Sequence, residues 1–341
     1  MGPFVFDGLY CGTRSNNEAL RKLDRLRLPS VARVTHKALM FGLEFAPVLT
    51  PFLVRGRFDL VHETYFANAY SGGRARKVVT IHDVIPVDRP EYVNRRNRFF
   101  SARNLRRQCR EAARVISVSQ YTKRKIVEYT GMDAERITVI PCGVAPLSGE
   151  LDPEFLSSRG LEGKRFVLYV GNLQSRKNIG LIAAALRLLN DAHQDVLFVV
   201  AGHANSESRA ILTECHTALG TRFHHLGFVS DAQKWTLLRH AAALILPSLY
   251  EGFGIPIIEA YLASCPALIA NNSSLTELCV DERQLFDANS SIDLAGRITD
   301  VLDGAAWVQE SVERGLASTP GYSWRAVAER TAAVYEQVLG A

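Results

Sequence analysis

The chain has 341 residues, of which 47% are hydrophobic and 22% are charged, and a formal net charge of +5. This length suffices for two domains of ordinary size, and the composition is that of a globular protein. The six scattered cysteines form no Cys-x-x-Cys pair, which argues against a zinc site and a disulfide framework. Neither a run of about 18 apolar residues nor a basic n-region occurs, so we expect no spanning helix, no signal peptide and a cytoplasmic location.

Short apolar runs alternate with stretches of helical spacing along the first half of the chain. We expect strands at Phe4–Phe6, Leu60–Val61, Val78–Ile81, Val115–Val118 and Ile137–Ile140, and helices near 16–27, 33–53, 95–113 and 120–130. The last of these helices has its own boundary signals, because Ser119 is suited to an N-cap and Gly131 to a C-terminal stop.

The second half continues this alternation, which predicts parallel sheets. The expected strands are Phe166–Val170, Val196–Ala201, Phe223–Leu226, Ala243–Leu246 and Ala267–Ala270, and the expected helices 177–190, 207–219, 231–240, 256–263, 292–303 and 323–338. The stretch from Pro141 to Pro153 has glycines, prolines and no periodicity, so we place a linker there. The pattern indicates an α/β protein of two Rossmann-like, doubly wound domains that leave a cleft between the carboxyl ends of their strands.

The charge is distributed unevenly between the two halves. Residues 1–150 hold 25 Lys and Arg against 14 Asp and Glu, whereas the rest of the chain is acidic. Much of the excess lies in one predicted helix and just beyond it, at Arg95, Arg96, Arg98, Arg103, Arg106, Arg107, Arg110 and Arg114. Such a face is either solvated or rests on anionic lipid headgroups. Nucleic acid is the least favoured partner, because no nucleic-acid motif accompanies the charge.

The most informative stretch runs from Glu251 to Ala260, after an apolar run that predicts a buried strand. Gly252 and Gly254 let the backbone approach a ligand closely, and Pro256 suits the first turn of a helix. The free N–H groups at a helix start favour a phosphate. With Glu251 before the turn and Glu259 inside the helix, the segment suits a diphosphate flanked by two sugars. Two surface glutamates at this spacing also arise by chance.

A second phosphate-binding segment is predicted after the first strand of the second half. Gly171 follows this strand, and Arg176 and Lys177 stand at the expected start of the next helix. Arg176 can bind phosphate oxygens in a bidentate manner, and Lys177 can act as a point charge. Alone, the segment would be read as an ordinary loop with two solvated bases.

In the first half, His82 and Asp83 stand at the end of a predicted strand, where they would face the cleft. A lone histidine is more often structural than catalytic, but this position favours a functional role. Asp83 is the candidate to orient it. For Ser119 and Thr122, after another strand, we favour helix capping over a functional role.

Together, these motifs resemble the donor site of the retaining glycosyltransferases of family four, which have the GT-B fold. The resemblance runs from about Leu53 to Val338. It implies an acceptor-side domain at 1–145, a donor domain at 146–322, and a C-terminal helix at 323–341 that crosses back to brace the first domain.

The resemblance also implies roles for single residues. Arg176 and Lys177 would stabilise the departing nucleoside diphosphate, Glu259 would bind the ribose hydroxyls, and Glu251 would bind the transferred sugar. His82 would contact the same sugar and the reaction centre. The remaining donor contacts would come from Gly171, Phe228, Val229, Phe253, Gly254 and Ile255, with Phe228 and Val229 at the base.

Two positions depart from the family pattern. Asn172 follows Gly171 where many relatives have a basic residue, so one phosphate contact is weaker or comes from elsewhere. The segment from Asp7 to Asn16 replaces the usual glycine-rich loop, and Gly12 and Arg14 are the residues there that could approach the donor or acceptor.

The implied function is retaining transfer of a hexose, with mannose or a deoxyhexose on GDP as the first guess. The acceptor would be a growing or lipid-linked glycan of the bacterial surface. No Asp-x-Asp motif occurs, so we expect no metal and no other cofactor. Alternatives are a small-molecule-directed transferase of the same fold and a non-catalytic nucleotide-sugar-binding scaffold. A dinucleotide oxidoreductase is disfavoured, because no strand precedes a Gly-x-Gly-x-x-Gly turn.

Overall fold

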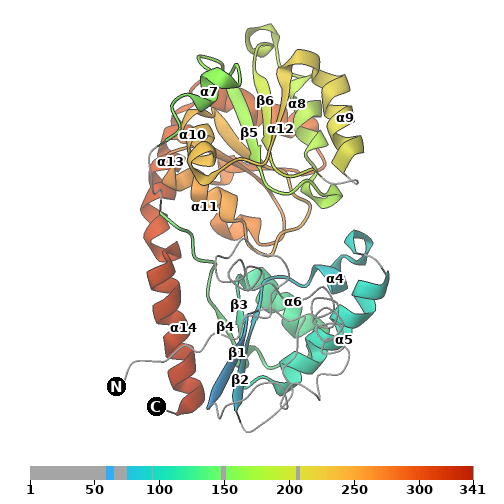
Figure 1. Cartoon of the computed structure of the whole chain (residues 1–341), viewed down its shortest axis with the longest axis vertical. Helices are drawn as coiled ribbons and strands as arrows, with labels where there is room; N and C mark the ends of the chain where they lie inside the picture. The colour runs from blue at the N-terminus through green and yellow to red at the C-terminus, as the bar shows by residue number, and fades with distance from the viewer. Residues whose placement is uncertain (1–58, 65–74, 94, 147–150, 205–207, 341) are drawn as a thin grey trace, which may run out of the picture. The chain divides into compact units, whose positions relative to one another are not determined.

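The structure is a computed structural model that describes residues 59–64, 75–93, 95–146, 151–204 and 208–340 (Figure 1). The chain divides into two units, of which Met1–Arg55 with Tyr70–Gly72 lies outside the described residues. The other unit holds every element described below. The expected strand Phe4–Phe6, the helices near 16–27 and 33–53, and the segment with Gly12 and Arg14 lie outside the described residues.

The first sheet has four parallel strands in the order β1-β2-β3-β4. Their bounds are β1 Leu60–Glu63, β2 Arg76–Ile81, β3 Arg114–Ser117 and β4 Ile137–Val139. The helices around this sheet are α4 Ile85–Asp88, α5 Arg95–Glu111, α6 Gln120–Thr130 and α14 Trp324–Leu339. Each strand coincides with an apolar run to within two residues, because both faces of a parallel sheet are buried.

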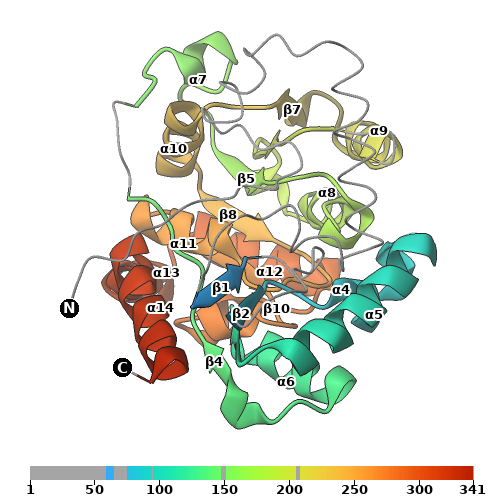
Figure 2. The same ribbon diagram turned by 60° about the horizontal axis from the view of Figure 1, so that its bottom comes forward.

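Alternate residues of these strands serve two different cores. Val79 and Val115 pair with each other and share a core with Leu105 of α5 and Ile126 of α6. Their neighbours Val78 and Ile116 share another core with Val334 and Val338 of α14. Figure 2 shows α5 and α6 on one side of β2 and α14 on the other. Because side chains alternate along a strand, one short strand holds helices on both faces.

Helix α6 has the boundaries that its sequence predicts. The Ser119 hydroxyl accepts a hydrogen bond from the backbone N–H of Thr122 at 3.0 Å, which is the geometry of an N-cap. Gly131 ends the helix with a φ of 68°, a conformation that glycine adopts without strain. Both expected boundary residues are confirmed.

The second sheet has six parallel strands in the order β10-β9-β8-β5-β6-β7. Their bounds are β5 Phe166–Val170, β6 Leu197–Ala201, β7 Phe223–Gly227, β8 Ala243–Leu246, β9 Ala267–Ala270 and β10 Leu285–Phe286. The chain runs outward from β5 to β7 and then returns to the other side of β5 with β8. This reversal is the signature of a doubly wound sheet, and it puts the loops after β5 and β8 next to each other.

The helices around the second sheet form two groups. The first comprises α8 Gly180–Leu186, α9 Ser208–Leu219 and α12 Ser291–Leu302, and the second comprises α7 Phe155–Ser158, α10 Asp231–His240, α11 Ile255–Leu262 and α13 Ala306–Ser318. Members of each group pack against one another (Figure 1). The strands between these groups are apolar, and their residues Phe166, Leu244 and Ile269 are fully buried.

Four elements around the second sheet differ most from the sequence prediction. The helix expected at 177–190 covers only Gly180–Leu186, because Ser175–Lys177 form a 3-10 turn that ends at Asn178 with a φ of 53°. The short strand β10 and the helices α7 and α13 were not predicted. A Cβ on Gly315 of α13 would lie 2.3 Å from the Tyr261 ring, so this glycine permits α13 to lie close to α11.

Helix α14 follows the second sheet in sequence but packs on the first. Besides the shared apolar core, Tyr335 lies edge-on to the His62 ring, with 5.5 Å between ring centroids. Near its start, Val144 of the expected linker pairs with Ser323. The exact domain boundaries stay a prediction. Within the described ranges, no helix has the length and apolar character needed to cross a bilayer.

Candidate functional site

The predicted site residues of the second half lie at the carboxyl edge of its sheet. Because all six strands are parallel, the loops after β5, β8 and β9 leave from the same edge. Gly171 follows β5 with a φ of 149°, which favours glycine. Loops from β5 and β8 are joined directly, since the Leu249 N–H donates to the Arg176 carbonyl at 2.8 Å.

Arg176, Lys177 and Glu251 come together in one ion-pair cluster. Arg176 Nη1 lies 3.1 Å from Glu251 Oε2, and Lys177 Nζ contacts Glu251 Oε1. The Ser248 hydroxyl donates to the same Oε1 at 2.7 Å. The side chains of these three charged residues are 12–18% exposed. The structure therefore brings together three of the predicted catalytic residues.

Charge pairing decides the ionisation of Glu251. Burial alone would raise the pKa of this carboxyl, but the charges of Lys177 and Arg176 and the hydrogen bonds from Lys177 and Ser248 hold it below its ordinary value. Nearby, burial raises the pKa of Asp83 against the opposing effects of the Ile85 N–H and Arg176. Glu251 is thus the ionised partner of the two cations.

The turn after Glu251 requires its glycines. A Cβ on Gly252 would lie 2.0 Å from the His82 carbonyl oxygen. Gly254 caps α11 with a φ of 144°, and a Cβ there would lie 2.9 Å from Leu278. Helix α11 begins at Ile255, one residue before the expected Pro256. Phe253 is buried and Ile255 is exposed, so the two predicted donor contacts here differ in accessibility.

Polar residues after β9 support this turn, and the sequence analysis missed them. Ser273 Oγ accepts a hydrogen bond from the Glu251 N–H at 3.1 Å. Ser274 Oγ lies 2.9 Å from the carbonyl oxygens of both Glu251 and Phe253, and Asn272 donates to the Ser248 carbonyl at 3.0 Å. The signal was the Asn-Asn-Ser-Ser run directly after a predicted strand.

Glu259 also has a cationic partner that the sequence analysis missed. Lys234 Nζ on α10 lies 2.7 Å from Glu259 Oε1 and 3.2 Å from Asp231. Burial opposes the charge on Lys234, but Glu259 and Asp231 hold its pKa above its ordinary value. Helix α10 begins directly after the turn with Phe228 and Val229, where Phe228 is 77% exposed. The predicted ribose and base contacts therefore lie on connected elements.

The residues predicted in the first half lie at the carboxyl end of β2. His82 is exposed, and its Nε2 lies 3.1 Å from the Thr64 carbonyl oxygen. Asp83 accepts a hydrogen bond from the Ile85 N–H at 3.0 Å, so its carboxyl holds the start of α4. Thr122 donates to the Gly252 carbonyl at 3.4 Å in addition to its part in the α6 cap. Gly252 thus touches both His82 and Thr122.

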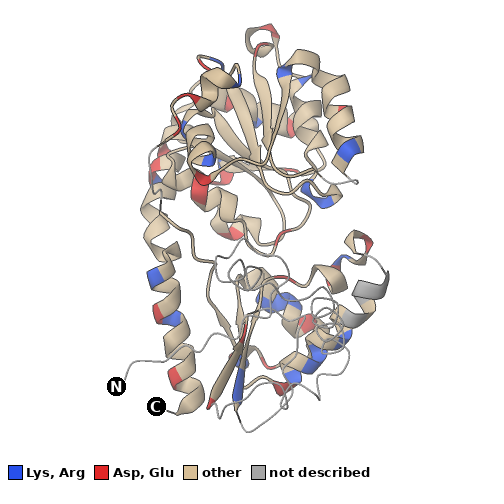
Figure 3. Cartoon of the chain, viewed as in Figure 1, with Lys and Arg blue, Asp and Glu red and all other residues tan. Residues whose placement is uncertain are grey.

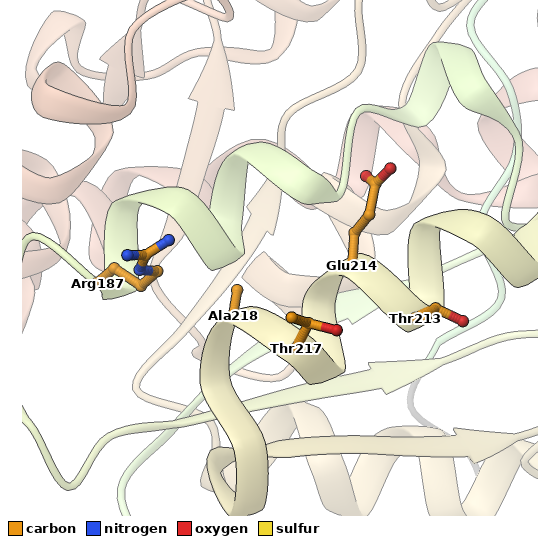
Figure 4. A pocket seen from close by; sticks show the side chains of 5 residues that line it. All are labelled: Arg187, Thr213, Glu214, Thr217 and Ala218. Carbon is orange, nitrogen blue, oxygen red and sulfur yellow. The ribbon is translucent and has the colours of Figure 1, made fainter.

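Metal-binding clusters and cavities would mark other possible sites. No group of three or more metal-binding side chains occurs among the residues that the structure describes. An open cavity of about 410 Å³ lies between α8 and α9, lined by Arg187, Thr213, Glu214, Thr217 and Ala218 (Figure 4). None of the predicted site residues lines this cavity. The candidate site is therefore the cluster around Glu251 and not the cavity.

Two family models match adjacent parts of the chain. The model "Glycosyltransferase Family 4" matches residues 8–146, and the model "Glycosyl transferases group 1" matches residues 153–314. The second match contains Arg176, Lys177, Glu251 and Glu259.

Individual relatives agree with these models. The chain is 28% identical over 268 residues to the O-antigen chain mannosyltransferase B of Escherichia coli, covering 76% of this chain and 70% of the relative. It is 29% identical over 231 residues to a glycogen synthase of Mycobacterium tuberculosis, covering 66% of this chain and only 54% of that enzyme. The solved sucrose-phosphate synthase of Thermosynechococcus elongatus has the same fold, with a TM-score of 0.71, 20% identity, and coverage of 83% and 74%. The chain belongs to the family 4 glycosyltransferases of the GT-B fold.

Proposed function

We propose that the protein is a retaining hexosyltransferase, which moves a hexose from a nucleoside diphosphate sugar to a growing or lipid-linked glycan. The observation that carries this proposal is the meeting of Arg176, Lys177 and Glu251 beside the glycine turn that opens α11. Two cations and the free N–H groups of a helix start suit a diphosphate, and the adjacent carboxylates suit sugar hydroxyls. An intact set of such groups favours an enzyme over a silent scaffold.

The donor would lie along the carboxyl edge of the second sheet. Its base would meet the turn with the exposed Phe228, and its ribose would meet Glu259. Its diphosphate would meet Arg176 and Lys177, and its sugar would meet Glu251. His82, exposed at the end of β2, would contact the transferred sugar.

The proposed mechanism is a front-face displacement that retains the anomeric configuration. The acceptor oxygen bonds to the anomeric carbon while the bond from that carbon to the diphosphate oxygen breaks. The acceptor proton passes to the leaving diphosphate, whose growing charge Arg176 and Lys177 stabilise. Glu251 is an unsuitable nucleophile, because both of its oxygens are held by cations and by Ser248.

Mannose on GDP is the proposed donor, supported by the similarity to the O-antigen mannosyltransferase. A glucose donor is the second candidate, because the similarity to glycogen synthase is of the same level. No described side chain would distinguish guanine from another base of the donor nucleotide. The turn with Phe228 and Val229 would offer backbone groups and an aromatic ring to any nucleoside.

A donor panel tests the function. The protein would be titrated calorimetrically with GDP-mannose, GDP-deoxyhexoses, UDP-glucose and ADP-glucose, and incubated with each donor without acceptor. We expect one donor to bind and to be hydrolysed slowly, with the α-anomer detected first by NMR when an α-linked donor is used. Failure of every donor to bind would refute the proposal. Binding without hydrolysis or transfer would favour the scaffold alternative.

We propose a peripheral position on the inner face of the plasma membrane for the basic first half. Figure 3 shows Lys and Arg side by side on α5 and α6. Arg103, Arg106 and Arg110 of α5 are exposed, whereas Arg107 is half-buried. Anionic headgroups would gain about 1 kcal/mol per basic residue near the surface. The side chains of Arg95, Arg96 and Arg98 lie outside the described residues.

A further inference from the structure

The two cations predicted to bind the diphosphate already share one anionic partner in the structure. Both contact the Glu251 carboxylate, and the Ser248 hydroxyl occupies the same oxygen as Lys177. All three charged side chains are largely buried, so water screens their attraction only weakly. An arriving diphosphate therefore meets cations that have an anionic partner of their own.

Arg176 has partners that hold it in place independently of Glu251. Arg176 Nη1 donates to the Tyr250 carbonyl at 2.9 Å, and its Nε donates to Gln174 Oε1 at 3.1 Å. The backbone of Glu251 is fixed by Ser273 and Ser274. With Arg176 and the backbone of Glu251 held, the Glu251 side chain can leave Arg176 by rotation while the loops stay in place.

We propose that Glu251 is a resident counter-ion that competes with the diphosphate and thereby separates donor from product. The proposal rests on the donor site described under the proposed function. In the intact donor, hydroxyls of the sugar offer Glu251 new hydrogen bonds, so the carboxylate can give up Arg176 and Lys177 to the diphosphate. After transfer, the sugar no longer offers Glu251 hydrogen bonds. Glu251 then pairs with the cations again, and the nucleoside diphosphate loses its contacts with Arg176 and Lys177.

The competition has a direct consequence for affinity. A free nucleoside diphosphate must displace Glu251 or share cations with it, and it gives Glu251 no new partner in return. A carboxylate that loses its cations while buried is costly. The intact donor avoids this cost because its sugar accompanies the diphosphate. Removing the charge of Glu251 should therefore strengthen the binding of the product nucleoside diphosphate. It should also reduce the difference in affinity between the donor and this product.

The test uses Glu251→Gln, which keeps the shape and a hydrogen-bonding capacity but removes the charge. Calorimetry with the nucleoside diphosphate of the donor found in the panel should give a dissociation constant about tenfold lower than wild type, equivalent to about 1.4 kcal/mol. Steady-state turnover should fall, and rapid-quench kinetics should show a burst of product followed by slow release. Ser248→Ala, which loosens the carboxylate, should shift product affinity in the same direction by about threefold.

Glu259→Gln is the matched control, because it removes the same charge from the same site without touching Arg176 or Lys177. It should not tighten diphosphate binding. If both variants bind the diphosphate more tightly to the same extent, the cause is the general loss of negative charge and the counter-ion role of Glu251 is refuted. Unchanged or weaker diphosphate binding in Glu251→Gln would also overturn the counter-ion role. If wild type binds neither donor nor diphosphate, the proposed function fails. If wild type binds and hydrolyses donor but Glu251→Gln does not bind diphosphate more tightly, only this inference fails.

Discussion

His62 should make the folded protein sensitive to mild acid. Its Nδ1 lies 2.5 Å from the Tyr335 hydroxyl of α14, and its Nε2 lies 2.8 Å from Thr80 Oγ1. Burial, with a smaller contribution from His82, lowers the pKa of His62 from 6.5 to about 4. The unfolded chain therefore binds the proton more readily than the folded chain between these two values.

The sign and size of the effect follow from this difference. Stability is unaffected by His62 well above pH 6.5, falls as the pH drops below that value, and stops falling below pH 4. The full loss corresponds to about 3 kcal/mol, of which about 2.5 kcal/mol is lost by about pH 4.5. This is a large part of the stability of an ordinary domain.

Urea denaturation between about pH 7 and pH 4.5 measures the effect. His62→Gln keeps a polar partner for Tyr335 and Thr80 but cannot titrate, so its stability should fall less over this range, by about 2.5 kcal/mol. His203→Gln, at an exposed loop position, is the control and should follow wild type. Parallel curves for wild type and His62→Gln would refute the reasoning, because another group would then bind the proton.

Three further predictions concern the site and the basic face. Glu259→Ala should weaken calorimetric binding of the nucleoside diphosphate by about 1.5–3 kcal/mol, as expected for a lost charged hydrogen bond, and unchanged affinity would exclude Glu259 from the site. Gly252→Ala should abolish donor hydrolysis and destabilise the protein by about 1–3 kcal/mol in urea, because its Cβ would meet the His82 carbonyl, and a wild-type denaturation midpoint would show that the turn can relax. Reversing Arg103, Arg106 and Arg110 to Glu should release the protein from anionic vesicles in flotation assays at low salt while nucleotide affinity stays unchanged, and absence of wild-type binding would leave the solvated-face alternative.

The strands of this protein were predictable because both faces of a parallel sheet are buried. Three predicted strands agree with the structure at both ends, namely Phe166–Val170, Ala243–Leu246 and Ala267–Ala270. A short, continuous apolar run is typical of a strand that is buried on both faces. The helix expected at 177–190 was wrong at both ends, because α8 covers only Gly180–Leu186. Residues 174–178 contain no apolar residue, and the chain turns at Asn178 in a left-handed conformation that apolar periodicity does not encode.

The pairing of charges could not be predicted from the sequence. Arg176 and Glu251 are 75 residues apart and meet only because β8 returns beside β5. Taken alone, the motif with Arg176 and the motif with Glu251 each predict a contact between the charged side chain and a ligand. The same holds for Lys234, which meets Glu259 only because α10 and α11 pack together.

The distribution of these pairs bears on how the proposed donor site would achieve specificity. Of the two acids of the motif, Glu251 contacts two cations and Glu259 contacts one. With Arg176, Lys177 and Lys234 on the other side, the five groups carry a net charge of only about +1. A site of free cations would bind any phosphate by Coulomb attraction alone. A site of exchangeable ion pairs instead favours the ligand that offers partners to the acids and the cations together, and a nucleoside diphosphate sugar has hydroxyls on both sides of its phosphates.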